Sequence, residues 1–162
     1  MRTLFLVRHA KSSWGDPGLS DRERPLNDRG ERDAPKMGKR LAKQGVKPDV
    51  ILSSPARRAL ATARVIAEEL DFKRADILVD DRLYAAEADT LQRIIGELGD
   101  KQKCVMLVGH NPELTELAHR FSGEDTHMPT CAVAEFAFDA KSWPNAMKDR
   151  PAKFSLHTPQ KQ

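Results

Sequence analysis

Unbroken apolar runs restrict the fold of this chain more than any other feature of its sequence. Three such runs lie at residues 3–7, 49–52 and 104–108, and a weaker one lies at residues 77–79. Strands that are buried on both faces have this pattern, and such strands occur mainly in parallel sheets. We therefore predict a buried and mostly parallel sheet.

Segments with helical spacing separate these runs, because their apolar residues recur at steps of three and four. The predicted helices lie at residues 37–46, ending near Gly45, at residues 60–70, at residues 91–98, and from Pro112 to Phe121. Pro35 is unfavourable inside a helix, so it marks either a kink or a late helix start. The alternation of strands and helices predicts an α/β fold.

The C-terminal part of the chain carries weaker signals. Residues 132–138 alternate between apolar and polar and predict a late edge strand, and residues 154–157 predict a last short strand. From about residue 141 onward the chain is polar and punctuated by proline, so we expect the rest of this extension to be a loosely held tail. The length fits one compact domain, which we predict to span residues 1–162.

The composition is that of an ordinary globular protein, with 40% hydrophobic and 31% charged residues. No apolar run approaches the roughly 20 residues that span a bilayer, and the apolar stretch at the N-terminus is too short for a signal peptide. The net charge of +3 comes from interspersed acids and bases, which does not favour nucleic-acid binding. We therefore expect a cytoplasmic monomer that binds neither nucleic acid nor a membrane. Cys104 and Cys131 form no CxxC pair and are predicted to be buried, reduced thiols.

Polar groups follow three of the predicted strands. Arg8 and His9 follow the first run, residues 53–58 follow the second, and residues 109–112 follow the third. In open α/β sheets, ligands bind at the carboxyl ends of the strands. The three stretches can therefore meet in one pocket and supply it with two histidines and at least two arginines.

These side chains suit phosphoryl transfer, in which catalysis consists mostly of positioning and of charge stabilisation. Arginine offers a forked donor set that matches phosphate oxygens. A neutral imidazole can attack phosphorus, and nearby arginines would disfavour the charged form of His9. A hydrogen bond from the other ring nitrogen would fix the tautomer of His9, but the sequence does not identify its acceptor.

The chain is similar to a known family in three motifs that occur in the same order. Arg8-His9, residues 54–63 (Ser-Pro-Ala-Arg-Arg-Ala-Leu-Ala-Thr-Ala) and residues 108–112 (Val-Gly-His-Asn-Pro) resemble the motifs of the histidine phosphatase superfamily, also called the phosphoglycerate-mutase-like superfamily. Residues 8–14 and 24–30 are typical of its small bacterial phosphohistidine phosphatases of the SixA type. The resemblance runs from residue 2 to about residue 138. It implies a three-layer sandwich in which helices flank the central sheet.

The resemblance also implies roles for individual residues. His9 would be the nucleophile, and Arg8, Arg58 and His110 would complete the catalytic set by binding the transferred phosphoryl group. Arg57 is expected to be solvated or at the rim of the pocket. The family uses no metal, the sequence shows no cluster of metal ligands, and we expect no cofactor. Two further interpretations come from the residues themselves. Trp14 either lines the substrate entrance or has a packing role. The histidines expected at the surface are His119, His127 and His157.

The chain departs from the family pattern at several positions. Ala10 replaces a common glycine, and Lys11 and Gly15 stand where many relatives carry Glu and Asn. Ala85, in Arg-Leu-Tyr-Ala, stands where mutases and ester phosphatases carry a Glu that protonates the leaving alkoxide. The missing acid favours either a phosphoramidate substrate such as phosphohistidine, whose P–N bond is intrinsically labile, or very weak hydrolysis of esters. The carboxyl groups that could substitute, if a loop brings them in, are those of Asp21, Glu23 and Glu87.

Three functional hypotheses remain. The leading one is an enzyme that removes phosphate from phosphohistidine on a protein. The second is a phosphatase of the same superfamily that acts on a small phosphate ester, such as a sugar phosphate or a nucleotide. The third is a non-catalytic module that binds phosphate, and replacing His9 would distinguish it because binding could then survive without turnover.

Overall fold

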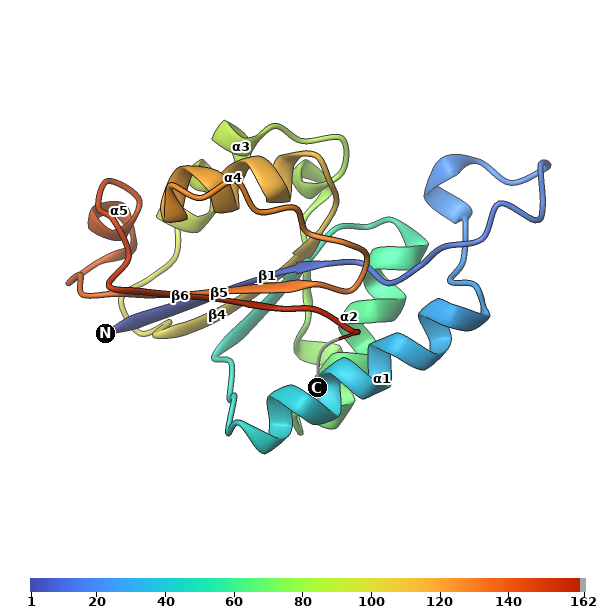
Figure 1. Ribbon diagram of the computed structural model, residues 1–162, viewed down its shortest axis with the longest axis horizontal. Helices are drawn as coiled ribbons and strands as arrows, with labels where there is room; N and C mark the ends of the chain where they lie inside the picture. The colour runs from blue at the N-terminus through green and yellow to red at the C-terminus, as the bar shows by residue number, and fades with distance from the viewer. Residues whose placement is uncertain (161–162) are drawn as a thin grey trace.

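The computed structural model describes residues 1–160, and Figure 1 shows its helices on both sides of a central sheet. In chain order the elements are β1 (Arg2–Arg8), η1 (Asp21–Glu23), α1 (Asp28–Lys43), β2 (Val50–Ser53), α2 (Arg57–Glu69), η2 (Arg74–Asp76), β3 (Leu78–Val79), η3 (Asp81–Leu83), α3 (Ala88–Gly96), β4 (Cys104–Gly109), α4 (Glu113–Ser122), β5 (Val133–Phe138), α5 (Trp143–Ala146) and β6 (Lys153–His157). The segments labelled η are single turns of 3-10 helix. None of the helices within residues 1–160 is long and apolar enough to cross a membrane.

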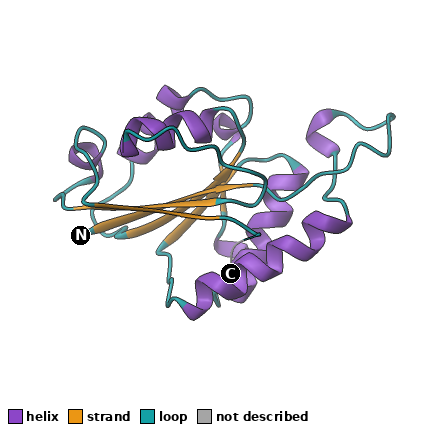
Figure 2. Cartoon of the chain, in the orientation of Figure 1, coloured by secondary structure: helices purple, strands orange, loops and turns teal. Residues whose placement is uncertain are grey.

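The sheet has six strands in the order β3-β2-β4-β1-β5-β6. The first four run parallel to one another, while β5 is antiparallel to both β1 and β6. The prediction of a mostly parallel sheet is thus confirmed, and all four predicted apolar runs form strands (Figure 2). β1 lies in the interior of the sheet, between β4 and β5.

Two apolar layers explain why β1 is apolar without interruption. Leu4 and Leu6 belong to the cluster shared with α3, α4 and α5, whereas Phe5 and Val7 belong to the cluster shared with α1 and α2. Successive side chains of a strand point to opposite faces, so a strand covered on both sides must be apolar at every position. The result is the predicted three-layer sandwich, with α1 and α2 below the sheet in Figure 1 and α3 and α4 above it.

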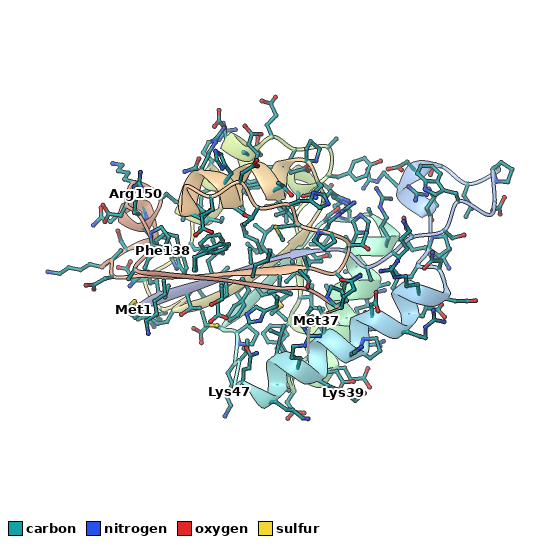
Figure 3. The ribbon with its side chains drawn as sticks, in the orientation of Figure 1. Met1, Met37, Lys39, Lys47, Phe138 and Arg150 are labelled. Carbon is teal, nitrogen blue, oxygen red and sulfur yellow. The ribbon has the colours of Figure 1, made fainter. Side chains whose placement is uncertain are left out.

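α1 buries one side and exposes the other. Met37 points from α1 toward the sheet, while Lys39 points away from it (Figure 3). The helix begins at Asp28, where the Asn27 side chain accepts a hydrogen bond from the backbone N–H of Gly30. The alternative of a late helix start at Pro35 is therefore wrong, because Pro35 lies inside a helix that an earlier cap has already begun.

The C-terminal segment corrects two further expectations. β5 is not an edge strand, because β6 pairs along its free side, as the pattern of residues 154–157 predicted. The part of the extension before β6 is not a loose tail either: Trp143 is fully buried and donates its indole N–H to the carbonyl of Gln102. The last two residues of the predicted tail, 161 and 162, lie outside the described residues. The burial of this one large aromatic residue outweighs the polar composition around it. Of the two thiols, Cys131 is buried and Cys104 is half-buried, and burial raises the pKa of both to about 12.

Candidate active site

The structure brings the four predicted site residues into one cavity of about 470 Å³. Arg8 and His9 come from the end of β1, Arg58 from the first turn of α2, and His110 from the connection between β4 and α4. β1, β2 and β4 are parallel, so the segments that follow them emerge at the same edge of the sheet. Convergence at this edge is what the three motifs predicted.

A hydrogen bond to the backbone fixes the ring of His9. Its Nδ1 lies 2.8 Å from the carbonyl oxygen of Ala10, which can only accept a hydrogen bond. Nδ1 therefore carries the proton, and Nε2 keeps the lone pair that a nucleophile needs. The N–H of Ala10 in turn donates to Thr62 Oγ1 at 3.0 Å, and that hydroxyl donates to the carbonyl of Arg58 at 2.8 Å. α2 thus holds the segment that orients the candidate nucleophile.

Both histidines of the cavity are neutral near pH 7. Burial lowers the pKa of His9 to about 3, and the positive charges of Arg58 and Arg8 act in the same direction. Burial, followed by the charge of Arg58, lowers the pKa of His110 to about 4. The two ring centroids lie 5.1 Å apart. An uncharged imidazole is thus held next to two permanent cations, the state expected of a nucleophile toward phosphate.

His110 is held through Ser54. Its Nε2 lies 2.7 Å from Ser54 Oγ, which also accepts the backbone N–H of Ala56 at 3.2 Å. The ring of Tyr84 meets His110 edge-on, with 5.8 Å between the ring centroids. These contacts fix the orientation of His110 from two neighbouring connections, one after β2 and one after β3.

Arg58 is oriented by Asp21. The guanidinium donates to the Asp21 carbonyl at 2.6 Å and to its carboxylate Oδ2 at 3.0 Å. Tyr84 donates its hydroxyl to the same Oδ2 at 2.6 Å. The hydrogen bond from Tyr84, followed by those from Arg58 and Arg24, holds the pKa of Asp21 far below its usual range. Asp21 is therefore an ionised partner of Arg58, and the idea that it replaces the missing acid is wrong.

The other carboxyl groups considered as substitutes do not reach the cavity. Glu23 and Glu87 are exposed and are not among the residues that line it. Within residues 1–160, no group of three or more His, Cys, Asp or Glu side chains lies close enough to hold a metal ion. Ala85 lines the cavity but offers no functional group.

Arg8 also lines the cavity. One of its terminal nitrogens donates to the carbonyl of Met128 at 3.0 Å, while its buried Nε has no hydrogen-bond partner within residues 1–160. Burial lowers the pKa of Arg8, but an arginine keeps its charge. Arg57, by contrast, is exposed, as predicted.

Sequence reasoning assigned no role to Arg24, which organises the rim of the cavity. It donates from Nε to the carbonyl of Ser13 at 2.9 Å, pairs with Asp21 at 3.0 Å and stacks on Trp14, with its guanidinium carbon 3.3 Å from the ring centroid. Trp14 lines the cavity and remains 77% exposed, so both of its interpretations hold in part. Residues 12–24 form the blue segment that projects from the body of the molecule in Figure 1.

Three further residues of the site had no predicted role, and two of them, Tyr84 and Glu113, line the cavity. Thr62 stands in the second motif, so its position was available although its contact was not. Tyr84 directly precedes Ala85, and its phenol is a donor that the family motif does not include. Glu113 follows Pro112 and is only 4% exposed within the cavity, a burial that no sequence pattern indicated.

Comparisons with known proteins give a matching family model and several relatives. Residues 4–94 match the family model of the histidine phosphatase superfamily, branch 1. A chloroplastic protein of Arabidopsis thaliana, described as uncharacterized, is 35% identical over 153 residues, which cover 90% of this chain and 70% of that protein. A 2,3-bisphosphoglycerate-dependent phosphoglycerate mutase of Thermobifida fusca is 33% identical over 109 residues, which cover 63% of this chain and 44% of the mutase.

Solved structures of similar fold cover almost the whole chain. The candidate phosphohistidine phosphatase SixA of Agrobacterium tumefaciens is 29% identical, with a TM-score of 0.80 and coverage of 95% of this chain and 97% of that one. The protein histidine phosphatase SixA complexed with tungstate has a TM-score of 0.78 at 22% identity and covers 97% of both chains, a likeness of fold.

Proposed function

Because the chain belongs to branch 1 of the histidine phosphatase superfamily, we propose that it is a phosphatase that carries the phosphoryl group on His9 as a covalent intermediate. The observation that carries the proposal is the state of His9: a neutral ring whose Nδ1 is tied to Ala10, beside the guanidinium groups of Arg8 and Arg58. In the first step, Nε2 attacks phosphorus and the leaving group departs. In the second step, water attacks the phosphohistidine and releases phosphate.

Arg8, Arg58 and His110 would stabilise the phosphoryl group in both steps. Negative charge spreads over the equatorial oxygens during transfer, and fixed donors that face this charge lower the barrier. Arg58 is already oriented by Asp21 before substrate arrives. Arg8 lines the same cavity with a charged guanidinium, one of whose terminal nitrogens is already held by the carbonyl of Met128.

We further propose that the substrate is phosphohistidine on a protein. The likeness to SixA-type proteins over almost the whole chain supports this substrate. So does the rim of the cavity, where Trp14 and Lys11 are exposed and could contact a protein surface. Aromatic residues and arginine are enriched at contact sites between proteins, and Trp14 stacks on Arg24 at this rim. Action as a cytoplasmic monomer of one domain remains part of this proposal.

A second candidate is a phosphatase for small phosphate esters. The observation that favours it is the buried carboxyl of Glu113 in the cavity, since a carboxyl can protonate a leaving alkoxide. Both candidates use the same four residues and differ in the leaving group.

The test is to incubate the purified protein, with a chelator present, with a phosphohistidine-bearing domain and with an aryl phosphate. His9→Ala should abolish turnover of both and the acid-labile phosphoenzyme, whereas His127→Ala, an exposed histidine, should change neither. Faster release from the phosphohistidine domain than from the ester supports the leading substrate, and the reverse order supports the second candidate. Full turnover by His9→Ala contradicts the mechanism, and phosphate binding without any turnover by the wild type would leave a binding module.

A further inference from the structure

Glu113 is a carboxyl group in the cavity that the steps above do not use. It is the first residue of α4, and it lines the same cavity as His9, Arg58 and His110. It is only 4% exposed. A carboxyl is rarely buried without a charged partner, and no ion pair of Glu113 occurs within residues 1–160. No ion pair within residues 1–160 therefore explains why the Glu113 carboxyl is buried.

Glu113 lies next to the segment that lacks the acid. Its carboxyl lies close enough to the backbone of Ala86 to form a hydrogen bond with it, and Ala86 is the residue after Ala85. Ala85, Ala86 and Glu113 all line the cavity. A carboxyl thus stands beside the position that lacks one in the chain, and it arrives from α4 instead of the segment after β3.

The surroundings keep the proton on this group more firmly than water would. Burial raises the pKa of Glu113, and hydrogen bonding with the backbone of Glu113 itself and of Ala86 offsets part of the rise. A phosphate dianion bound in the same cavity would raise it further, because a nearby negative charge disfavours the carboxylate. Asp21 behaves in the opposite way, since its hydrogen bonds keep it ionised. The pKa values of two carboxyl groups in one cavity are therefore shifted in opposite directions, as expected when one is an acid and the other a structural carboxylate.

We propose that Glu113 is a catalytic residue that donates a proton to the leaving group as the phosphoryl group moves to His9. This inference rests on the proposed function, because it requires transfer to His9. It extends that function to the leaving groups that need a proton, either the oxygen of an ester or the imidazole of a phosphohistidine whose ring is neutral.

The atoms and charges of the two steps balance. In the first, a bond forms between His9 Nε2 and phosphorus, the bond from phosphorus to the leaving atom breaks, and the proton of Glu113 passes to the leaving group. In the second, the oxygen of water bonds to phosphorus, the bond to Nε2 breaks, and the Glu113 carboxylate takes up a proton from the water. His9 keeps its Nδ1 proton, held by the Ala10 carbonyl, throughout.

The experiment compares aryl phosphates whose leaving phenols range from very acidic to weakly acidic. The test variant is Glu113→Gln, which keeps the shape and an oxygen that can accept from the backbone but has no proton to donate. The control is Glu116→Gln, an exposed residue on the same helix. A general acid contributes about 100-fold or more. We therefore expect the kcat/KM of Glu113→Gln to fall about 100-fold with phenyl phosphate and little with dinitrophenyl phosphate. With a phosphohistidine domain it should fall by an intermediate factor.

A purely structural role predicts a different pattern. If Glu113 only supports the backbone near Ala86, then Glu113→Gln will lower the rates with all substrates by the same factor or will leave all of them unchanged. Either result overturns the proposal. Glu113→Asp is the second variant, because it keeps a carboxylic acid; it should retain the shallow dependence on the leaving group even if its rates fall. Detection of the phosphoenzyme distinguishes failure of the proposed function from failure of the proposed role of Glu113. Absence of phospho-His9 in the wild type contradicts the proposed function, whereas its presence with an unchanged leaving-group dependence contradicts only the role of Glu113.

Discussion

His9 and His110 share one cavity and one charge state, yet their free nitrogen atoms differ. The Nδ1 of His9 is tied to a backbone carbonyl, which leaves Nε2 with its lone pair toward phosphorus. The Nε2 of His110 is instead hydrogen-bonded to the Ser54 hydroxyl. The two histidines are therefore suited to different tasks, because the nitrogen that each leaves free is set by its hydrogen-bond partner.

The low pKa values of these histidines predict an acid-sensitive fold. The unfolded chain binds a proton at each histidine near pH 6.5, whereas the folded chain resists protonation until about pH 3 for His9 and about pH 4 for His110. Stability therefore falls as the pH drops below 6.5, by up to about 2 kcal/mol per histidine between pH 7 and pH 5. Urea unfolding at both pH values should show a smaller loss for His9→Asn than for the wild type. An equal loss in both proteins would contradict the neutral state of His9.

At the scale of single residues, the motifs predicted which residues form the candidate site but not the contacts that each of them makes. Arg8, His9, Arg58 and His110 lie together as their motifs predicted. The acceptor of His9 Nδ1 could not be predicted, because it is the carbonyl of the next residue and depends on the local turn. The burial of Glu113 was equally inaccessible, because it depends on how α4 meets the segment at Ala85 and Ala86.

At the scale of elements, the segment 24–30 explains why the first helix and the rim of the cavity depend on each other. Asn27 caps α1 and donates its backbone N–H to the carbonyl of Lys11 at 2.9 Å. Arg24 holds Ser13 and Trp14 from the same segment. The helix start is therefore fixed by contacts with the rim, which periodicity in the helix alone does not reveal.

The backbone of α1 approaches the rim closely at Gly30. A Cβ added there would collide with the carbonyl oxygen of Lys11. We expect Gly30→Ala to lower the free energy of unfolding by about 1–3 kcal/mol, because the backbone of the two segments would have to separate, and to reduce turnover through the displaced rim. The control is Gly96→Ala at the end of α3, where an added Cβ meets nothing within 4 Å. Denaturant unfolding and steady-state kinetics of both variants check this, and equal behaviour would contradict the close contact.

At the scale of the whole molecule, stability and chemistry lie at different ends of the sheet. The candidate active site follows the carboxyl ends of β1, β2 and β4, whereas Trp143 binds the carbonyl of Gln102, just before β4 begins. The sequence indicated the site end through its motifs. It did not indicate the opposite end, because one buried tryptophan within a polar segment leaves no periodic signal.

Trp143→Ala should separate these two ends. Removing a fully buried tryptophan typically costs about 3–5 kcal/mol, so the free energy of unfolding should fall by that amount. The kcat of the variant should stay near the wild-type value at a temperature where it remains folded, because Trp143 does not line the cavity. Calorimetry together with kinetics at low temperature checks both parts, and a large fall in kcat of the folded variant would contradict the separation.

The interior position of β1 has a consequence for how the protein is made. The strand that ends in the candidate nucleophile is synthesised before its two sheet neighbours, which begin at Cys104 and Val133. A nascent chain that stops short of them presents an apolar strand with both edges open, which is a template for aggregation. Because His110 follows β4, the four residues of the candidate site can come together only after most of the chain has been synthesised.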